Sequence, residues 1–392
     1  MDGGRPARGG IACIVGARPN FMKMAPLVRA FGGERSLPGA VLIHTGQHYD
    51  FAMNGRLFDD LGLPEPDINL EVGSGSHAVQ TAEVMKRIEP VLDDLAPACV
   101  VVVGDVNSTL AVALVATKKG IPVVHVEAGL RSYDRAMPEE VNRVLTDQIS
   151  DLLYTTERAA EGNLVREGID PGRVHFAGNV MIDSLLHHRA RAVPPAATLA
   201  AAGAPAAAIE DPAGFAVVTL HRPSNVDDRA ALGESLSILR EVSARVPVVW
   251  PMHPRTRANV ERFGLAAAAA DPRIVLLPPQ GYLEMLGLMA GARLVLTDSG
   301  GVQEETTALA VPCLTMRDNT ERPITVEQGT NTLVGRDRAR ILAAVDGVVA
   351  TGGKRGRRPE LWDGHAAPRI ASHLAGWLAA RSRARTDAAS TR

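Results

Sequence analysis

Short apolar runs rich in β-branched residues alternate with helix-like segments along the whole chain. Continuous runs such as VVVV at 100–103 are typical of parallel strands that are buried on both faces. The pattern predicts strands at Ile11–Val15, Ala40–His44, Ala98–Val103, Pro122–Val126, Leu152–Thr155, Val174–Ala177, Phe215–Leu220, Val246–Trp250, Arg273–Leu277, Arg293–Thr297, Val311–Met316 and Asn331–Val334. This alternation predicts an α/β protein with two Rossmann-like, doubly wound domains, whose sheets we expect to face one cleft.

A segment rich in Pro, Ala and Gly separates the two halves of the pattern and indicates a connector that need not pack tightly. An apolar-patterned helix near the C-terminus is expected to pack back on the first domain. The predicted layout is a first domain at 11–190, a linker at 191–213, a second domain at 214–350, a C-terminal helix at 360–382, and disordered tails at 1–10 and 383–392.

Composition narrows the class of protein. The 392 residues include 42 Lys plus Arg and 44 Asp plus Glu, a formal net charge of −2, so no basic field indicates binding to nucleic acid. No apolar run is long enough to span a membrane. The three cysteines, Cys13, Cys99 and Cys313, form no CxxC motif and lie in or beside apolar runs, as reduced thiols do. We therefore expect a cytoplasmic protein with no nucleic-acid or membrane partner.

Polar residues and glycines follow the predicted strands. In open parallel sheets, ligands bind outside the carboxyl ends of the strands. The residues at these ends are Gly16-Ala17-Arg18, Gly46-Gln47-His48, Gly104-Asp105, Glu127-Ala128-Gly129, His221-Arg222, His253 and Asp298-Ser299-Gly300-Gly301.

The stretch TDSGGVQEE, residues 297–305, ends a strand and opens a helix. Gly300 and Gly301 would leave backbone N–H groups free to hold a diphosphate, and Ser299 would cap the helix or donate to phosphate. Glu305 lies one helical turn beyond Gly301, where a carboxylate can accept two ribose hydroxyls. The alternative is an ordinary Ser cap followed by acids that complement the helix dipole.

Two other strand ends of the second half carry imidazoles and cations. His221 and Arg222 follow one strand, and His253 and Arg255 follow the next. A single strand-end histidine is more often structural than catalytic. Its recurrence in one domain favours a nucleotide diphosphate as the ligand.

Charged residues also gather at strand ends of the first half. Arg18 and Lys23 flank a strand-to-helix turn, and Asp105 precedes a helix whose N-terminus it would also suit. Glu127 follows directly from a buried run, so an ordinary structural role explains it less well than it explains Asp105. Glu139, after Pro138, could simply complement a helix dipole and pair with Arg143.

Two patterns point to other chemistry but fit it poorly. GSGSHA at 73–78 matches a loose dinucleotide pattern, yet it does not close the first strand and no acid follows a next strand at the required place. His44 and His48 are four residues apart, but in a turn, where that spacing does not bring side chains together on zinc. The sequence therefore predicts neither an NAD site nor a metal site, and no cofactor.

In this order the motifs resemble the non-hydrolysing UDP-N-acetylglucosamine 2-epimerases, from Ile11 to Val334. The motifs are GARPNFMKMAPL, TGQH, GDVNSTLA, HVEAGLRS, MPEEVNR, HRPSNVDD, SGGVQEE and MRDNTERPITVEQGTN. The resemblance implies the glycosyltransferase-B architecture, a UDP-sugar substrate and a homodimer.

The resemblance also assigns roles residue by residue. It makes Asp105, Glu127 and Glu139 the catalytic carboxylates and places His221 near the leaving diphosphate. The substrate-binding positions that it implies are Arg18, Lys23, Arg222, His253, Ser299, Gly300, Gly301 and Glu305.

The chemistry of an N-acetylhexosamine explains why such a site needs several acids. Its C2 hydrogen is not next to a carbonyl, so it becomes removable only after oxidation at C3 or loss of the C1 substituent. With no NAD site in the sequence, elimination of UDP remains, followed by proton transfers on the two faces of C2. Sequence does not say which acid serves which face.

Some positions depart from the family's commonest pattern. Asn20 stands where many members have Glu, the 131–137 loop is shorter than in enterobacterial relatives, and TGQHYD replaces the QHRE type of members that a second substrate molecule activates. The TGQH form also occurs in relatives that act on diacetamido uronic acid nucleotides, so the sugar stays open. A retaining glycosyltransferase, a hydrolysing epimerase and a non-catalytic UDP-sugar sensor are the remaining alternatives.

Overall fold

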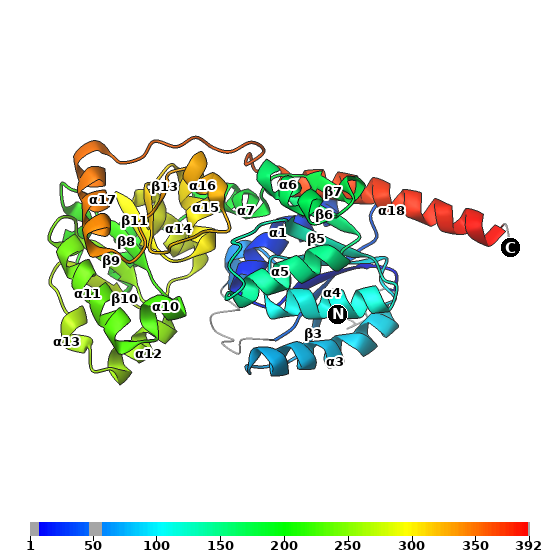
Figure 1. Cartoon of the computed structure of the whole chain (residues 1–392), viewed down its shortest axis with the longest axis horizontal. Coiled ribbons are helices and arrows are strands. Elements are labelled where there is room, and N and C mark those ends of the chain that lie inside the picture. The colour runs from blue at the N-terminus through cyan, green and yellow to red at the C-terminus, as the bar shows by residue number, and fades with distance from the viewer. Residues whose placement is uncertain (1–7, 47–56, 391–392) are drawn as a thin grey trace. The chain divides into compact units, whose positions relative to one another are not determined.

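The computed structural model describes residues 8–46 and 57–390 and divides the chain into two compact units. The first unit comprises residues up to Ser184 together with those from Glu360 onward, and the second comprises Leu185–Pro359. Each unit is a parallel sheet covered by helices, as the alternating pattern predicts (Figure 1).

The sheet of the first unit has seven strands in the order β3-β2-β1-β4-β5-β6-β7. The elements of this unit are β1 (Ile11–Val15), α1 (Arg18–Gly33), β2 (Ala40–His44), β3 (Ile68–Asn69), α3 (His77–Leu95), β4 (Cys99–Val103), α4 (Asn107–Lys118), β5 (Val123–Ala128), α5 (Pro138–Ile149), β6 (Leu152–Thr155), α6 (Arg158–Arg166), the 3₁₀ turn Pro171–Arg173, β7 (Val174–Phe176), most of α7 (Val180–His188) and α18 (Ala366–Ser390).

The sheet of the second unit has six strands in the order β10-β9-β8-β11-β12-β13. Its elements are the 3₁₀ turn Arg189–Arg191, α8 (Pro195–Ala201), α9 (Ala207–Glu210), β8 (Ala216–Thr219), α10 (Pro223–Val226), α11 (Arg229–Ser243), β9 (Val248–Pro251), α12 (Pro254–Arg262), α13 (Ala266–Ala269), β10 (Ile274–Leu277), α14 (Tyr282–Gly291), β11 (Leu294–Thr297), α15 (Gly300–Leu309), β12 (Cys313–Thr315), α16 (Pro323–Glu327), β13 (Asn331–Leu333) and α17 (Arg338–Thr351).

The strand order places a topological switch point in each sheet. In the first unit, β1 lies between β2 and β4. The chain therefore continues from β1 to β2 on one side of this point and from β4 to β5 on the other. In the second unit, β8 lies in the same way between β9 and β11. Ligands of doubly wound sheets bind at the carboxyl ends of such strand pairs.

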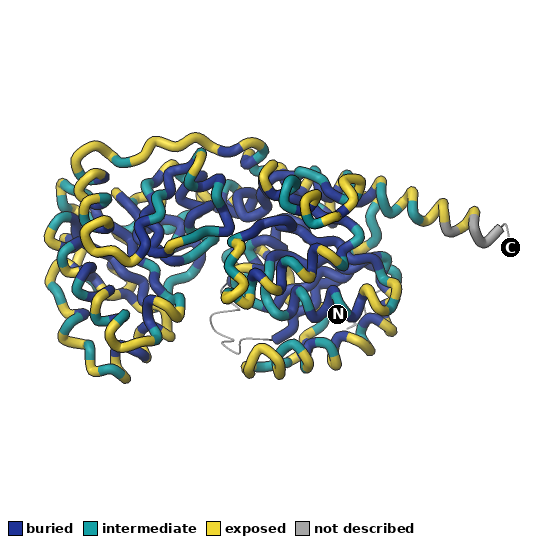
Figure 2. Tube along the Cα trace, in the orientation of Figure 1, coloured by how far each residue is buried: buried dark blue, intermediate teal, exposed yellow. Residues whose placement is uncertain are grey.

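The central strands are buried on both faces, which explains their continuous apolar sequences (Figure 2). All five residues of β4 are buried, and Val100 and Val102 pack in one apolar cluster with residues of α3 and α4. In the second unit a corresponding cluster joins β8 and β9 to α11 and α17.

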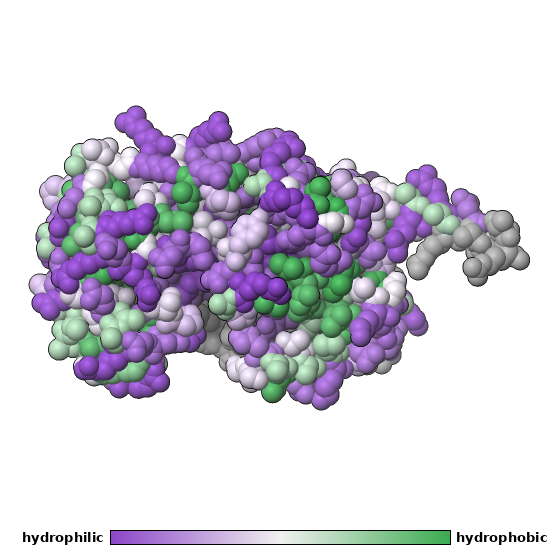
Figure 3. Space-filling model, viewed as in Figure 1, coloured by the Kyte–Doolittle hydropathy of each residue, from purple (hydrophilic) through white to green (hydrophobic). Residues whose placement is uncertain are grey.

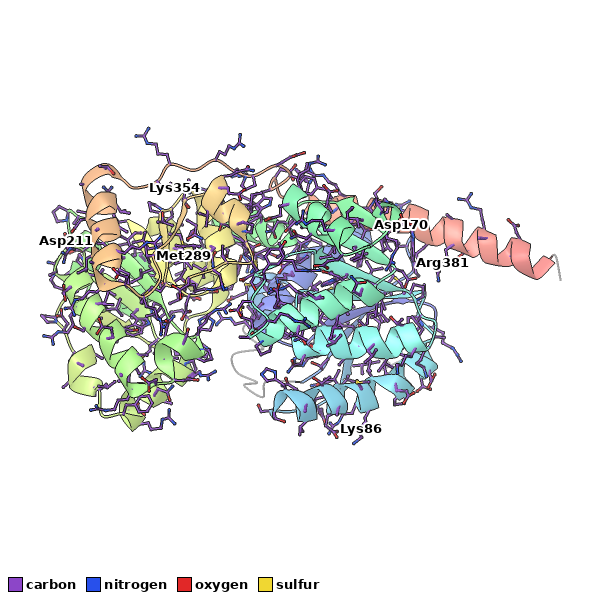
Figure 4. All side chains as sticks on the ribbon, in the orientation of Figure 1. Lys86, Asp170, Asp211, Met289, Lys354 and Arg381 are labelled. Atoms are coloured by element: carbon purple, nitrogen blue, oxygen red, sulfur yellow. The ribbon has the colours of Figure 1, made fainter. Side chains whose placement is uncertain are left out.

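The segment predicted as a loose connector is packed against the second unit. Leu199 of α8 is fully buried in one apolar cluster with Phe215 and Met289, and Asp211 pairs with Arg273 at 3.2 Å; Figure 4 labels Asp211 and Met289. A proline in the first turn and the alanines that follow it favour a helix here, and the leucine gives that helix a face to bury.

The C-terminal helix α18 belongs to the first unit and packs on α1. The backbone N–H groups of Ala366 and Ala367 donate to the Asp183 carboxylate at 3.1 and 2.7 Å. The helix continues to Ser390, whereas the sequence predicted a disordered tail from 383 (Figure 1). The Ala and Arg residues of this stretch are strong helix formers, so a helix that packing has already started extends through them.

Of the N-terminal tail, only residues 8–10 are described. The N–H of Gly9 donates to the carbonyl of Leu95 at 2.9 Å, so this part is hydrogen-bonded rather than disordered.

Candidate active site

The switch point of the first sheet brings together the turns after β1 and β4. Asn20 of α1 connects them: its side-chain oxygen accepts from the N–H of Ala17 at 3.0 Å, and its amide donates to the Val103 carbonyl at 3.0 Å. An ionised carboxylate could not donate the second bond, so an amide suits this position. Arg18 begins α1 in the same turn and is partly exposed.

Lys23 and Glu127 form a buried ion pair. The Lys23 ammonium lies 2.7 Å from Oε1 of Glu127, and both side chains are almost completely buried. Lys23 also lies over the turn after β4, because a Cβ added to Gly104 would be 2.9 Å from its Nζ. The sequence predicted Lys23 as a substrate ligand and Glu127 as a catalytic acid, and the structure brings the two together.

The sequence predicted Glu127 just after a strand, but the structure places it inside β5. Its φ of 72° is left-handed, and the pairing of β5 with β6 shifts register between Val126 and Ala128. This bulge lengthens the strand by one unpaired residue. A non-glycine residue in this conformation is held there by its surroundings and is typical of functional sites.

Asp105 and the start of α5 form a second group of charges. Arg143 donates from Nε to Oδ2 of Asp105 at 3.1 Å and pairs with the buried Glu140. Glu140 also accepts from the N–H groups of Ser132 and Tyr133, at 2.9 and 2.8 Å, and thereby holds the loop before α5. Glu139, the predicted catalytic acid, is partly exposed at the first turn of α5.

His221 and Asp298 come together at the switch point of the second sheet. Nδ1 of His221 lies 2.9 Å from Oδ1 of Asp298, which is fully buried while the His221 side chain is 40% exposed. Burial alone would raise the pKa of Asp298, but hydrogen bonds and charge from His221, with hydrogen bonds from Asn225 and Arg222, hold the pKa below its usual value. The carboxylate therefore stays ionised and directs the His221 ring.

The other two predicted residues of these loops lie beside this pair. The Arg222 side chain donates from Nε to the Asp298 carbonyl at 2.9 Å. His253 caps α12, where its Nδ1 accepts from the N–H of Arg255 at 3.2 Å. The His253 ring centre is 5.6 Å from that of His221.

The start of α15 is the position that the sequence predicts for the diphosphate. Ser299 occupies the N-cap position, but its hydroxyl makes no capping bond, so the ordinary cap reading of this serine is not what the structure shows. A side chain at Gly300 would displace the ends of the Arg322 and Glu321 side chains, since an added Cβ would lie 2.4 Å from Arg322 and 2.5 Å from Glu321. Gly300 and Gly301 are partly exposed at the positive end of the helix.

Glu305 is buried in the second turn of α15. Its neighbour Tyr282 is also buried, and burial together with the charge and hydrogen bond of Glu305 raises the pKa of the Tyr282 hydroxyl well above its usual value. Glu304, the preceding residue of the helix, pairs with Arg322 at 2.9 Å.

The residues of these groups that were not predicted as site residues include Glu140, Arg143, Asp298 and Tyr282. The strand-end position of Asp298, next to Ser299 and Gly300, was a signal that could have included it. Nothing in the sequence indicates the pairing of Arg143 with Asp105, which is 38 positions away.

A cavity of about 480 Å³ in the first unit lies apart from these groups, at the opposite ends of the strands. Ile121, Pro122, Ile149, Arg173 and Trp377 are among its lining residues. Among the described residues, no three His, Cys, Asp or Glu side chains lie together so as to hold a metal ion, and His48 falls outside them. Within residues 8–46 and 57–390, no helix is long and apolar enough to cross a membrane.

Comparison with known proteins identifies the family. The family model described as UDP-N-acetylglucosamine 2-epimerase matches residues 35–375. The UDP-N-acetylglucosamine 2-epimerase of Methanocaldococcus jannaschii is 43% identical over 86% of this chain and 91% of its own length. The UDP-2,3-diacetamido-2,3-dideoxy-D-glucuronate 2-epimerase of Pseudomonas aeruginosa is 42% identical over 85% of this chain and 90% of its own.

Solved structures agree with the sequence comparison. The crystal structure of the M. jannaschii UDP-GlcNAc 2-epimerase in complex with UDP-GlcNAc and UDP matches with a TM-score of 0.82 and 39% identity, over 93% of this chain and 99% of that one. The two parallel, doubly wound sheets have the glycosyltransferase-B architecture that the sequence predicted. The chain belongs to the UDP-N-acetylglucosamine 2-epimerase family and is an isomerase.

Proposed function

We propose that this chain interconverts UDP-N-acetylglucosamine and UDP-N-acetylmannosamine by inverting C2. The observation that carries the proposal is the group of acids at the first switch point: Glu127 on its bulge with Lys23, and Asp105 with Arg143. Family membership supplies the substrate class, because relatives at 40–43% identity bear this name.

The second unit would hold the nucleotide. The N–H groups at the start of α15 and the Ser299 hydroxyl suit the diphosphate, and Glu305 is assigned to the ribose hydroxyls. His221, directed by Asp298, and Arg222 would stabilise charge on the leaving diphosphate. Arg18 and His253 complete the predicted substrate contacts.

The reaction balances as an elimination and a re-addition. A carboxylate of the first unit takes the C2 proton, the C1–O bond breaks with its electron pair going to UDP, and a C1–C2 double bond forms. The intermediates are UDP and 2-acetamidoglucal. Protonation of C2 from the opposite face and attack of UDP on C1 then give the epimer. Asp105, Glu127 and Glu139 are the proposed acid and base groups.

The P. aeruginosa relative favours a second candidate for the sugar. Its name gives a UDP-diacetamido uronic acid, and its identity to this chain is close to that of the M. jannaschii enzyme. The same acids would then act on a substrate with a 3-acetamido group and a carboxylate.

Product analysis tests the proposal. The protein, dialysed against EDTA and without added NAD, is incubated in D2O with either UDP-sugar, and the products are followed by NMR. We expect the C2 epimer to form with deuterium at C2, since the acid that protonates C2 exchanges with solvent. Free N-acetylmannosamine would indicate hydrolysis, and transfer to an added acceptor would indicate a glycosyltransferase.

Glu127→Gln should lower turnover by about 10²-fold or more.

We also propose a cytoplasmic homodimer. The three cysteines are free and buried, and burial raises the pKa of Cys99 to about 12 and that of Cys313 to about 11, so these thiols are inert. Apolar residues gather over α4 and α5 (Figure 3), where Val141 and Leu145 are exposed. Leu145→Glu should give monomers in light scattering. Val165→Glu, at an exposed position of α6, should leave the dimer intact.

A further inference from the structure

A histidine in the middle of a buried strand makes two polar contacts that the reaction does not use. His125 of β5 is 0% exposed and lies between Val124 and Val126. Its Nδ1 is 2.7 Å from Oδ1 of Asp147, and its Nε2 is 2.8 Å from the carbonyl of Gly104. A carboxylate and a backbone carbonyl are both acceptors, so only a ring with protons on both nitrogens donates to both.

The surroundings of His125 balance this charge. Asp147 is buried as well, and its Oδ2 accepts from the Gly129 N–H at 3.1 Å and pairs with Arg131 at 2.7 Å. Arg131 in turn binds both oxygens of Glu167, at 2.8 and 2.6 Å. With both nitrogens of His125 protonated, two cations would alternate with two anions, which is how a buried charged group avoids the penalty of desolvation.

These contacts end on the two turns that carry the proposed acids. Gly104 directly precedes Asp105 and has a left-handed φ of 66°; its N–H donates to the Val126 carbonyl at 3.1 Å, and its own carbonyl receives His125. Gly129, with a φ of 79°, follows the Glu127 bulge by two residues. The glycines permit these turns but do not select them, since glycine adopts many conformations equally well.

The third partner is α5, which carries Asp147 one turn after Arg143 and in the same helix as Glu139. A rotation or shift of α5 would therefore move Arg143 away from Asp105 and Glu139 away from its position. His125 contacts both the Gly104 carbonyl and α5, in addition to the direct bonds that Asn142 and Arg143 of α5 make to Asp105.

We propose that His125 is a positioning residue: by donating from both ring nitrogens, it holds the Asp105 turn, the Glu127 bulge and α5 in one geometry. This proposal rests on the proposed roles of Asp105, Glu127 and Glu139. Displacing reacting groups by about 1 Å lowers turnover by as much as about 10²-fold, so the contacts matter although His125 does not touch substrate.

Two variants separate the two hydrogen bonds. The amide nitrogen of Asn occupies the place of the histidine Nδ1, and that of Gln occupies the place of Nε2. His125→Gln should therefore keep the bond to Gly104, while His125→Asn keeps only the bond to Asp147. We expect kcat to fall about 10²-fold in His125→Asn. In His125→Gln, kcat should be at least about tenfold higher than in His125→Asn. KM should change less than about threefold in both, because the nucleotide is bound by the second unit.

Two further measurements do not depend on activity. Nitrogen NMR of histidine-labelled protein should show protons on both nitrogens of the His125 ring. Hydrogen exchange of the peptide over 103–109 should be faster in His125→Asn than in His125→Gln. If the wild-type protein turns over no UDP-sugar, the proposed function fails while these measurements still report on His125.

Three results would overturn the proposal. The first is a neutral ring. The second is a kcat of His125→Asn close to that of the wild-type protein, and the third is a loss of kcat that merely follows the loss of folded protein in circular dichroism.

Discussion

At the scale of single residues, Asp298 offers the sharpest test of the second unit. It is buried, its pKa is held below the usual value despite burial, and its Oδ1 faces Nδ1 of His221. The ionised carboxylate accepts from Nδ1 of His221 and so fixes the orientation of the ring. Asp298→Asn should lower kcat by about 10²-fold or more.

UDP affinity should change less than about threefold in the same variant, as titration calorimetry can measure. Asp227→Asn is the matched control, because Asp227 is a partly exposed acid of the same unit that pairs with Arg255 and not with His221. Equal losses of kcat in the two variants would contradict the role of Asp298.

Sequence predicted where the site residues lie along the chain but not which of them pair. Strand ends locate Asp105, Glu127 and His221, because the ligand-binding edge of a parallel sheet is where its strands end. The partners Arg143 and Asp298 are 38 and 77 positions away from the residues they hold. Such contacts depend on how helices pack on the sheet, which no local pattern contains. The catalytic and binding roles themselves stay predictions.

At the scale of elements, the long buried strands were predictable and the irregular pieces were not. All twelve predicted strands occur, because strands buried on both faces have an unambiguous apolar sequence. The edge strand β3 was missed, since its two residues are too few to show a pattern. The end of β5 was wrong because a bulge admits a charged residue into the strand, and α8 was missed because Pro and Ala also occur in linkers.

The contact of α18 with the sheet contains a pair of histidines that should respond to pH. The rings of His373 and His175 are 3.8 Å apart, and Nδ1 of His373 is 2.9 Å from the Tyr154 hydroxyl. Burial lowers the pKa of both, and for His373 the charge of His175 adds to this. A released α18 would therefore bind more protons than a packed one. The packed state is favoured above about pH 6.5 and is weakened as the pH falls below it.

Hydrogen exchange of the peptide over 366–375, corrected for intrinsic rates, should accelerate between about pH 7.5 and 5.5. His373→Gln should remove most of this response. His365→Gln, an exposed histidine just before α18, should retain it. An unchanged response in His373→Gln would rule out the histidine pair as its source.

At the scale of the whole molecule, the chain passes between the two units twice, after Ser184 and after Pro359. The last element is thus part of the first unit. Trp362 is fully buried and donates from its indole to the Thr156 carbonyl at 3.0 Å, and Ile370 and Leu374 of α18 are buried as well. The first unit is therefore completed only when the C-terminus has been made.

This dependence predicts opposite results for two truncations. Removing a buried Trp side chain alone lowers the free energy of unfolding by about 3–5 kcal/mol, against a total of about 5–15 kcal/mol for a typical domain. A chain ending at Pro359 loses Trp362, Ile370 and Leu374 together and should not fold its first unit, so it should be insoluble or bind hydrophobic dyes. A chain ending at Ser382 loses the last turns of α18, where Arg383, Ala384, Thr386 and Asp387 are exposed, and should melt within about 2 °C of the full chain, since surface changes are nearly neutral. Thermal unfolding followed by circular dichroism compares the two. Normal folding of the chain that ends at Pro359 would show that the first unit is stable without α18.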